Sequence, residues 1–76
     1  MKELLTVLAQ ALVDDPDRVR VSERSEDGVR LLELSVSDDD RGKVIGKRGR
    51  TADALRTILD VVARQRGERC EMEILD

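Results

Sequence analysis

The segment 41–50, with the sequence RGKVIGKRGR, constrains the fold of this chain more than any other. It holds five of the 14 basic residues and no acidic one, so its formal charge is +5, whereas the whole chain carries −3. Two glycines, Gly46 and Gly49, bracket Lys47 and Arg48. Because glycine lacks a Cβ, the backbone can turn sharply at these positions. The segment therefore predicts a tight, basic turn whose charged side chains are exposed.

A helix is expected directly after this turn, and the combination suits an anionic ligand. The first turn of a helix presents unpaired N–H groups and the positive end of the helix dipole. Basic side chains beside such an end favour a phosphodiester backbone. The alternative is a glycine-rich turn between helices whose charges are simply solvated. The Walker A and dinucleotide-binding motifs are excluded, because Lys47 and Arg48 stand where those motifs require glycine.

The composition excludes several classes of site. The chain has no aromatic residue and no histidine, and Cys70 is its one cysteine. Bases therefore have no rings to stack on, which argues against the aromatic single-strand binding folds. Neither a disulfide nor a cysteine zinc site can form within the chain. We expect no cofactor, no metal and no enzymatic activity, because no nucleophile has an adjacent base.

The length of 76 residues predicts one small domain with a thin core. No apolar run approaches 18 residues, and the N-terminus lacks the pattern of a signal peptide. These features predict a cytoplasmic protein with no membrane contact. A basic segment in an acidic chain predicts modest binding of nucleic acid that weakens steeply with salt.

Hydrophobic periodicity predicts three helices, at 2–13, 41–45 and 50–65. It also predicts a hairpin turn at 25–28 and three strands, at 18–24, 29–37 and 69–75. The long helix is expected to bury one apolar stripe with Ala63 at its margin, formed by Leu55, Ile58, Leu59 and Val62. Cys70 alternates in phase with Met72, so we expect a core position for it rather than a reactive thiol.

Three consecutive acidic residues, Asp38, Asp39 and Asp40, precede the short helix. They could hold a divalent metal ion. They could instead cap the helix, one as the N-cap and the others near the positive end of its dipole. We favour capping, because it is the commoner use of aspartate at such a junction.

The order helix, strand, strand, short helix, G-x-x-G, long helix, strand resembles a KH domain of the prokaryotic arrangement, type II. The string DRGKVIGKRGRTADALRTIL is similar to that of the small bacterial single-KH-domain RNA-binding proteins of the KhpA type. The resemblance covers essentially the whole chain. It implies an α+β fold of topology α-β-β-α-α-β, with helices packed on one face of a three-stranded sheet. Residues 1–76 would be a single KH domain, 29–75 its minimal β-α-α-β core and 46–49 its GXXG loop.

The resemblance also implies a groove for about four nucleotides of single-stranded RNA. One wall would be the short helix, the GXXG loop and the start of the long helix, and the other a sheet edge with a loop. The sugar-phosphate backbone would contact Gly46, Lys47, Arg48 and Gly49, and further phosphate contacts would come from Lys43 and Arg50. Val44 and Ile45, with Ala52 and Leu55, would form an aliphatic floor under the bases. The alternative for Val44, Ile45 and Leu55 is a core position.

Partners follow from the same resemblance. It implies a homodimer, and pairing with a larger Jag/KhpB-type RNA-binding protein linked to cell elongation and division. The chain would act as an RNA chaperone or post-transcriptional regulator. One alternative is a KH fold that serves mainly dimerisation or protein interaction, with weak or no RNA binding, and another is a groove that takes single-stranded DNA. One departure from the family pattern is Asp53, which stands where relatives often carry basic residues and would repel phosphate.

Overall fold

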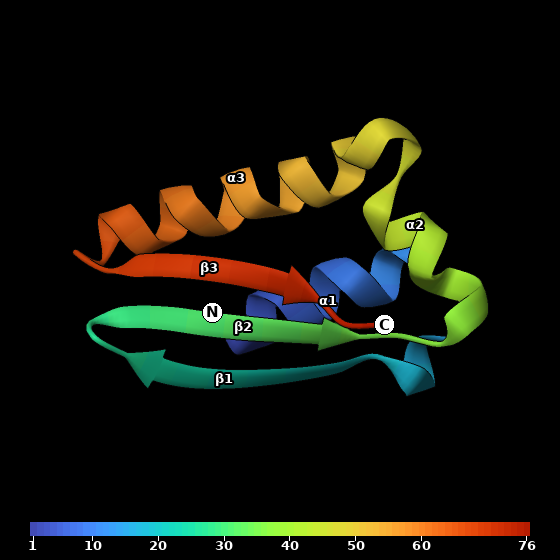
Figure 1. Ribbon diagram of the computed structural model, residues 1–76, viewed down its shortest axis with the longest axis horizontal. Helices are drawn as coiled ribbons and strands as arrows, with labels where there is room; N and C mark the ends of the chain where they lie inside the picture. Colours follow the sequence, from blue (N-terminus) through green and yellow to red (C-terminus); the bar gives the residue numbers. More distant parts are fainter.

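The computed structural model describes all 76 residues and has the predicted α-β-β-α-α-β order (Figure 1). Its helices are α1 (Lys2–Leu12), α2 (Arg41–Ile45) and α3 (Arg50–Gln65). Its strands are β1 (Arg20–Glu26), β2 (Val29–Ser35) and β3 (Arg69–Ile74). Three short 3₁₀ turns precede β1, α2 and α3 respectively, namely η1 (Pro16–Arg18), η2 (Asp38–Asp40) and η3 (Lys47–Gly49). The predicted α+β class and topology are confirmed.

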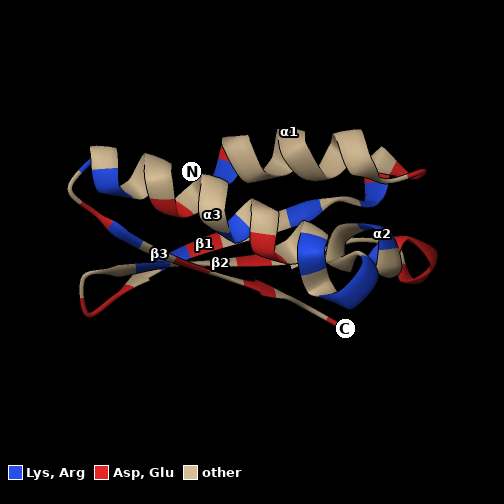
Figure 2. Ribbon diagram, turned by 90° about the horizontal axis from the view of Figure 1, so that it is seen from above, with Lys and Arg blue, Asp and Glu red and all other residues tan.

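The strands form one mixed sheet in the order β1-β2-β3. β1 and β2 are antiparallel, with Val21 opposite Leu34, and β2 and β3 are parallel, with Leu34 opposite Ile74. Helices α1 and α3 cover one face of this sheet, and no helix covers the other (Figure 2). Because β3 has a neighbouring strand on one side only, its outer edge, beside α3, is open.

β1 begins at Arg20, two residues later than predicted, because Pro16–Arg18 form a 3₁₀ turn. The Arg18 N–H donates to the Asp15 carbonyl oxygen at 3.1 Å, which closes that turn. β2 likewise ends at Ser35 rather than at residue 37. The two strands therefore lie where they were predicted. The predicted start of β1 was too early, and the predicted end of β2 was too late.

The hairpin between β1 and β2 is tighter than predicted. Ser25 and Glu26 still pair with β2, so the turn consists of Asp27 and Gly28 alone. Both residues have positive φ, 53° and 78°, as the two positions of a type I′ turn require. The Asp-Gly pair thus marked the centre of the turn correctly, and only its width was overestimated.

The core lies between the sheet and the helices and contains only aliphatic and methionine side chains. Leucines of the sheet and of the two long helices are almost completely buried, and so is one alanine in each of these helices. The thirteen residues of the cluster are Met1, Leu5, Ala9, Val19, Val21, Leu32, Leu34, Val36, Val44, Leu55, Leu59, Ala63 and Met72. No helix has the length and apolar character needed to cross a membrane.

Helix α3 buries a different stripe from the one predicted. Leu55 and Leu59 are buried as expected, but Ile58 is 40% exposed. Ala63, expected at the margin, is fully buried, and Ala52 is buried as well. Residues 52, 55, 59 and 63 follow the three- and four-residue spacing of one helical face. Alanine at both ends of this face lets the helix lie close to its neighbours, and the larger Ile58 then points outward.

Candidate nucleic-acid interface

The GXXG loop joins α2 to α3 through a backbone conformation at Gly46 that other residues cannot adopt easily. Its φ of 76° and ψ of 171° lie in a region essentially restricted to glycine. A Cβ at this position would overlap the side chain of Thr51. The Gly46 N–H donates to the Gly42 carbonyl oxygen at 2.8 Å, and the Gly49 N–H donates to the Gly46 carbonyl oxygen at 3.1 Å. These bonds close the end of α2 and the loop itself.

The predicted basic side chains of the loop are exposed and free. Lys47, Arg48 and Arg50 form no ion pair with any carboxylate. Arg48 (φ 59°, ψ 24°) and Gly49 (φ 75°, ψ 13°) are both left-handed, so the chain turns twice before it enters α3. Figure 2 shows this basic turn and the acidic turn η2 on either side of α2. The predicted separation of charge along the sequence is therefore also a separation in space.

Helix α3 starts immediately after the loop, and no side chain caps its N-terminus. Gly49 occupies the N-cap position, and no side chain caps the first N–H groups. The Arg50 N–H already donates to the Lys47 carbonyl oxygen. The start of this 16-residue helix still carries a partial positive charge that attracts an anion. Asp53 lies in this first turn with its side chain 76% exposed, and its Oδ1 accepts a hydrogen bond from Arg56 at 3.4 Å. A single carboxylate therefore opposes the positive potential at this end of the helix.

The predicted aliphatic floor is mostly core. Val44 is fully buried, and Ala52 and Leu55 are buried beside it. Ile45, which is 37% exposed, is the one member of this set that a ligand can reach. The core alternative weighed for Val44 and Leu55 therefore describes their position, and these residues support the loop from beneath.

The acidic turn η2 supplies the N-cap residue of α2 but no capping hydrogen bond, so the capping prediction was right in position and wrong in the bond that it implied. Asp40 stands at the N-cap position, but its side chain accepts no hydrogen bond from the backbone N–H groups of that helix. Its Oδ1 accepts from the Asp14 N–H at 3.2 Å and its Oδ2 from the Asp15 N–H at 3.0 Å. These donors lie 26 and 25 residues earlier in the sequence, so a local sequence pattern could not indicate them. No group of three or more His, Cys, Asp or Glu side chains is arranged to hold a metal ion.

Lys43, predicted to contact phosphate, already has two anionic partners. Its Nζ lies 2.9 Å from Asp14 Oδ2 and 3.3 Å from Asp40 Oδ1. Hydrogen bonds to Asp14 and then to Asp40 raise the pKa of the Lys43 ammonium above its ordinary value, against a smaller opposing effect of burial. Its contact with phosphate stays a prediction, and its environment differs from that of Lys47, Arg48 and Arg50.

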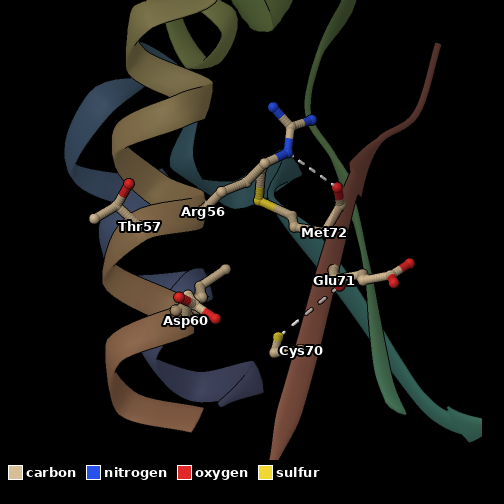
Figure 3. Close-up of a pocket in the computed structure, with 7 residues that line it drawn as sticks. Arg56, Thr57, Asp60, Cys70, Glu71 and Met72 are labelled. Carbon is tan, nitrogen blue, oxygen red and sulfur yellow. Dashed lines mark hydrogen bonds between the residues drawn. The ribbon is translucent and has the colours of Figure 1, made fainter. Parts of the chain in front are cut away.

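A groove of about 500 Å³ lies between α3 and the open edge of β3. Arg56 crosses it, because its Nε–H donates to the Met72 carbonyl oxygen at 3.4 Å (Figure 3). The sequence predicted a sheet edge as the second wall but did not identify Arg56, whose spacing of three from Asp53 was the available signal. The lining comes from Arg56, Thr57 and Asp60 of α3 and from Cys70, Glu71 and Met72 of β3.

Cys70 lies in this groove and is partly buried, with its strand neighbour Met72 in the core. Burial, and next to it the negative charge of Glu23, raises the pKa of the Cys70 thiol above its ordinary value. A thiol with a raised pKa is a weak nucleophile at neutral pH. Cys70 therefore packs against the core from its margin, rather than inside it as predicted, and its thiol is not activated.

The sequence matches a protein family along nearly its whole length. The family profile described as "KhpA/KhpB, KH domain" covers residues 2–74. The chain belongs to this family. Among its relatives is a protein of Halalkalibacterium halodurans named "RNA-binding protein KhpA", which is 50% identical over 76 residues and is covered completely, as is this chain. Proteins with the same name from Clostridium acetobutylicum and Aquifex aeolicus are 47% and 45% identical, over 99% and 100% of this chain and 100% and 96% of their own lengths.

Family membership confirms the resemblance that the sequence suggested. The KH-domain family and the α-β-β-α-α-β topology agree with the predicted type II arrangement. The names of the relatives describe RNA-binding proteins and no enzyme, in agreement with the prediction of a chain without enzymatic activity.

Proposed function

We propose that this chain is a non-catalytic protein that binds single-stranded RNA through its GXXG loop. The observation that carries the proposal is a set of three exposed cations without ion pairs. Lys47 and Arg48 lie between Gly46 and Gly49, and Arg50 begins α3, whose start has no side-chain cap. Such a site offers basic side chains and the positive end of a helix dipole to a phosphate backbone. The relatives in Halalkalibacterium halodurans and Clostridium acetobutylicum bear the name RNA-binding protein, which supports RNA as the ligand.

In the proposed complex, about four nucleotides cross the loop. Phosphate oxygens accept hydrogen bonds from Lys47 and Arg48 and from the first N–H groups of α3, and Arg50 adds a contact where α3 begins. Gly46 and Gly49 let the ligand backbone come close to the protein backbone. Ile45 lies beneath a base, with Val44 supporting it. Because these contacts address phosphate and the apolar faces of bases, the preference for particular bases is weak.

A small cytoplasmic protein with these properties would act as an RNA chaperone or post-transcriptional regulator. Its local basic patch sits in a chain of net charge −3, so the field of the whole molecule opposes an anionic ligand. We therefore propose modest affinity, with release favoured as the ionic strength rises.

The test is titration of a short unstructured single-stranded RNA at several salt concentrations. Two or three phosphate contacts predict that log K falls against log salt with a slope of about −1.5 to −2, at about −0.7 for each contact with a single strand. Binding that does not change with salt contradicts a phosphate clamp. Single-stranded DNA of the same sequence, measured beside it, shows whether the 2′-OH contributes.

A homodimer is part of the proposal, and an exposed apolar pair supports it. Ile58 and Val61 of α3 are 40% and 49% exposed and lie one helical turn apart, where residues three positions apart are neighbours. Val7 of α1, the other long helix that covers the sheet, is exposed as well. A second copy of the chain, or a Jag/KhpB-type protein, could cover this surface.

The alternative is a KH fold that serves mainly protein interaction, with weak or no RNA binding. It is favoured by the exposed Ile58 and Val61 and by Asp53, which opposes phosphate near the loop. RNA titration and sedimentation velocity at micromolar concentration distinguish the two. Dimer formation without RNA binding supports the alternative, and RNA binding by the chain supports the clamp.

A further inference from the structure

Asp40 is the one buried charged residue of the protein, with 1% of its surface exposed. Its carboxylate has four hydrogen-bond partners, two for each oxygen. Oδ1 accepts from the Asp14 N–H at 3.2 Å and from Lys43 Nζ at 3.3 Å. Oδ2 accepts from the Asp15 N–H at 3.0 Å and from Ser37 Oγ at 3.1 Å. Burial of a charge is unfavourable unless the charge is paired and hydrogen-bonded. The four donors together therefore stabilise the buried carboxylate.

These partners come from three separate segments of the chain. Asp14 and Asp15 belong to the link that follows α1, Ser37 to the link that follows β2, and Lys43 to the middle of α2. The ends of α1 and α2 lie near each other (Figure 1). One carboxylate therefore connects the N-terminal helix, the sheet and α2 at a single point. Asp40 and its partners are called the Asp40 joint below; they are Asp14, Asp15, Ser37 and Lys43.

Helix α2 needs such a joint because it is only five residues long. A helix of that length is not stable by its own backbone bonds, so tertiary contacts must fix its position. Gly46, the first residue of the GXXG loop, follows α2 directly. Any rotation of α2 about its axis is therefore transmitted to the loop and to the side chains that it carries.

The side chain of Lys43 is held within this joint by two carboxylates. Its Nζ bridges Asp40 Oδ1 and Asp14 Oδ2, at 3.3 and 2.9 Å. The other basic residues of the loop region that were expected to contact phosphate have no such partner. Two of the three N–H donors of Lys43 are thus engaged. A swing of Nζ away from these partners and toward a phosphate would take the cation from the buried Asp40 carboxylate, which the burial of Asp40 opposes.

We propose that Asp40 is a positioning residue for the GXXG loop and that Lys43 belongs to the Asp40 joint rather than to the RNA contact surface. The part of this inference that is tested by RNA binding rests on the proposed function. It revises the expectation that Lys43 adds a phosphate contact, and it assigns the backbone clamp to Lys47, Arg48 and Arg50.

The first test compares Lys43→Gln with Lys47→Gln in the salt dependence of RNA binding. Each variant loses one positive charge, and the two positions lie four residues apart in the sequence. Lys47→Gln should make the slope of log K against log salt shallower by about 0.7, the value for one lost single-strand contact. Lys43→Gln should leave the slope unchanged and lower the melting temperature instead. An equal loss of slope in the two variants overturns the assignment of Lys43.

The second test compares Asp40→Asn with Asp39→Asn, which removes the same charge from the exposed neighbour. Asp40→Asn should weaken RNA binding by about fivefold in the folded protein, because a loosened support moves the site by a fraction of an ångström. It should also speed amide exchange at Asp14 and Asp15 and shift the amide resonances of residues 46–49, with or without RNA. Asp39→Asn should change none of these.

The amide data separate failure of this inference from failure of the proposed function. If the wild type does not bind RNA, the proposed function is wrong, and the loop resonances of Asp40→Asn still decide the positioning role. Unchanged loop resonances in folded Asp40→Asn overturn that role whatever the RNA result.

Discussion

Gly46 and Gly49 have the same role in the motif but different reasons to be glycine. Gly46 adopts φ 76° and ψ 171°, and a Cβ there would overlap Thr51 at the start of α3. Gly49 is left-handed, but a Cβ there would meet nothing within 4 Å. The first glycine is thus required by packing as well as by conformation, and the second by conformation alone.

Alanine substitution should separate these two reasons. Gly46→Ala should lower the free energy of unfolding by about 3 kcal/mol or more, because strain and overlap act together. Gly49→Ala should lower it by only about 1 kcal/mol, the strain of one left-handed residue. Urea denaturation of both variants measures the difference. Equal destabilisation would show that the close approach of Thr51 does not limit the loop.

Asp53 is the residue that most directly opposes the proposed ligand. Asp53→Lys should strengthen RNA binding about threefold at low salt, since one exposed charge pair is worth a few tenths to 1 kcal/mol. Glu26→Lys is the matched control, because Glu26 is also exposed and also pairs with an arginine, Arg24, but lies at the hairpin. RNA titration of both variants checks the effect. An equal gain in both would mean that net charge, and not position, governs affinity.

At the scale of elements, the short helix α2 carries the loop, and the Asp40 carboxylate holds that helix. Burial of this carboxyl opposes its ionisation, but the N–H groups of Asp14 and Asp15, the Lys43 ammonium and the Ser37 hydroxyl outweigh burial. The pKa of Asp40 is therefore held below its ordinary value. The stabilisation is complete above the ordinary aspartate pKa of about 3.9 and is lost as the pH falls through the lower value of the folded state.

Because the pKa of Asp40 is lowered in the folded state, the stability that its charge provides should depend on pH. Between neutral pH and pH 5 the wild type should be more stable than Asp40→Asn by a constant amount. Below about pH 4 the difference should shrink, because a protonated carboxyl resembles the amide. Urea unfolding at a series of pH values measures it, with Asp39→Asn as control for the neighbouring charges of Asp38, Arg41 and Lys43. A difference that does not change with pH would show that the charge of Asp40 does not stabilise the fold.

Most elements were predictable because their signals are local. The span of α3 was predicted without error, since Gly49 and Gly67 bound a strongly periodic segment. The exposed state of the loop cations followed from Gly46 and Gly49, which bracket Lys47 and Arg48. The buried stripe was less predictable, because Ile58 and Ala63 exchange their expected places when the helix packs closely on its neighbours. The partners of Asp40 were not predictable, since Asp14 and Asp15 lie a third of the chain away.

At the scale of the whole molecule, the two proposed interaction surfaces lie on different parts of the fold. The basic loop is at the start of α3, whereas Ile58 and Val61 lie on its outer side further along the helix. A rise of 1.5 Å per residue places Ile58 about 13 Å from Gly49 along the axis. A dimer formed through these two residues therefore leaves the loop open to RNA.

Charge placed on the apolar surface should break the proposed dimer. Ile58→Glu with Val61→Glu should convert a dimer to a monomer at micromolar concentration, because two carboxylates would then be buried unpaired at the interface. Both positions are exposed in the single chain, so the thermal stability of the monomer should change little. Sedimentation velocity checks the mass. A double variant that stays dimeric would place the interface elsewhere.

The GXXG loop is proposed to clamp single-stranded RNA. The most direct measurement is RNA binding and thermal melting of the wild type, of Lys47→Asp/Arg48→Asp, and of Arg66→Asp/Arg69→Asp. The control pair is also exposed and free of ion pairs, and it changes the net charge equally, but it lies beyond the other end of α3, where Arg66 follows the helix and Arg69 begins β3. We predict that the loop variant loses at least about tenfold in affinity, or 1.4 kcal/mol, with unchanged melting, and that the control loses much less. Equal affinity of the loop variant and the wild type would contradict the clamp.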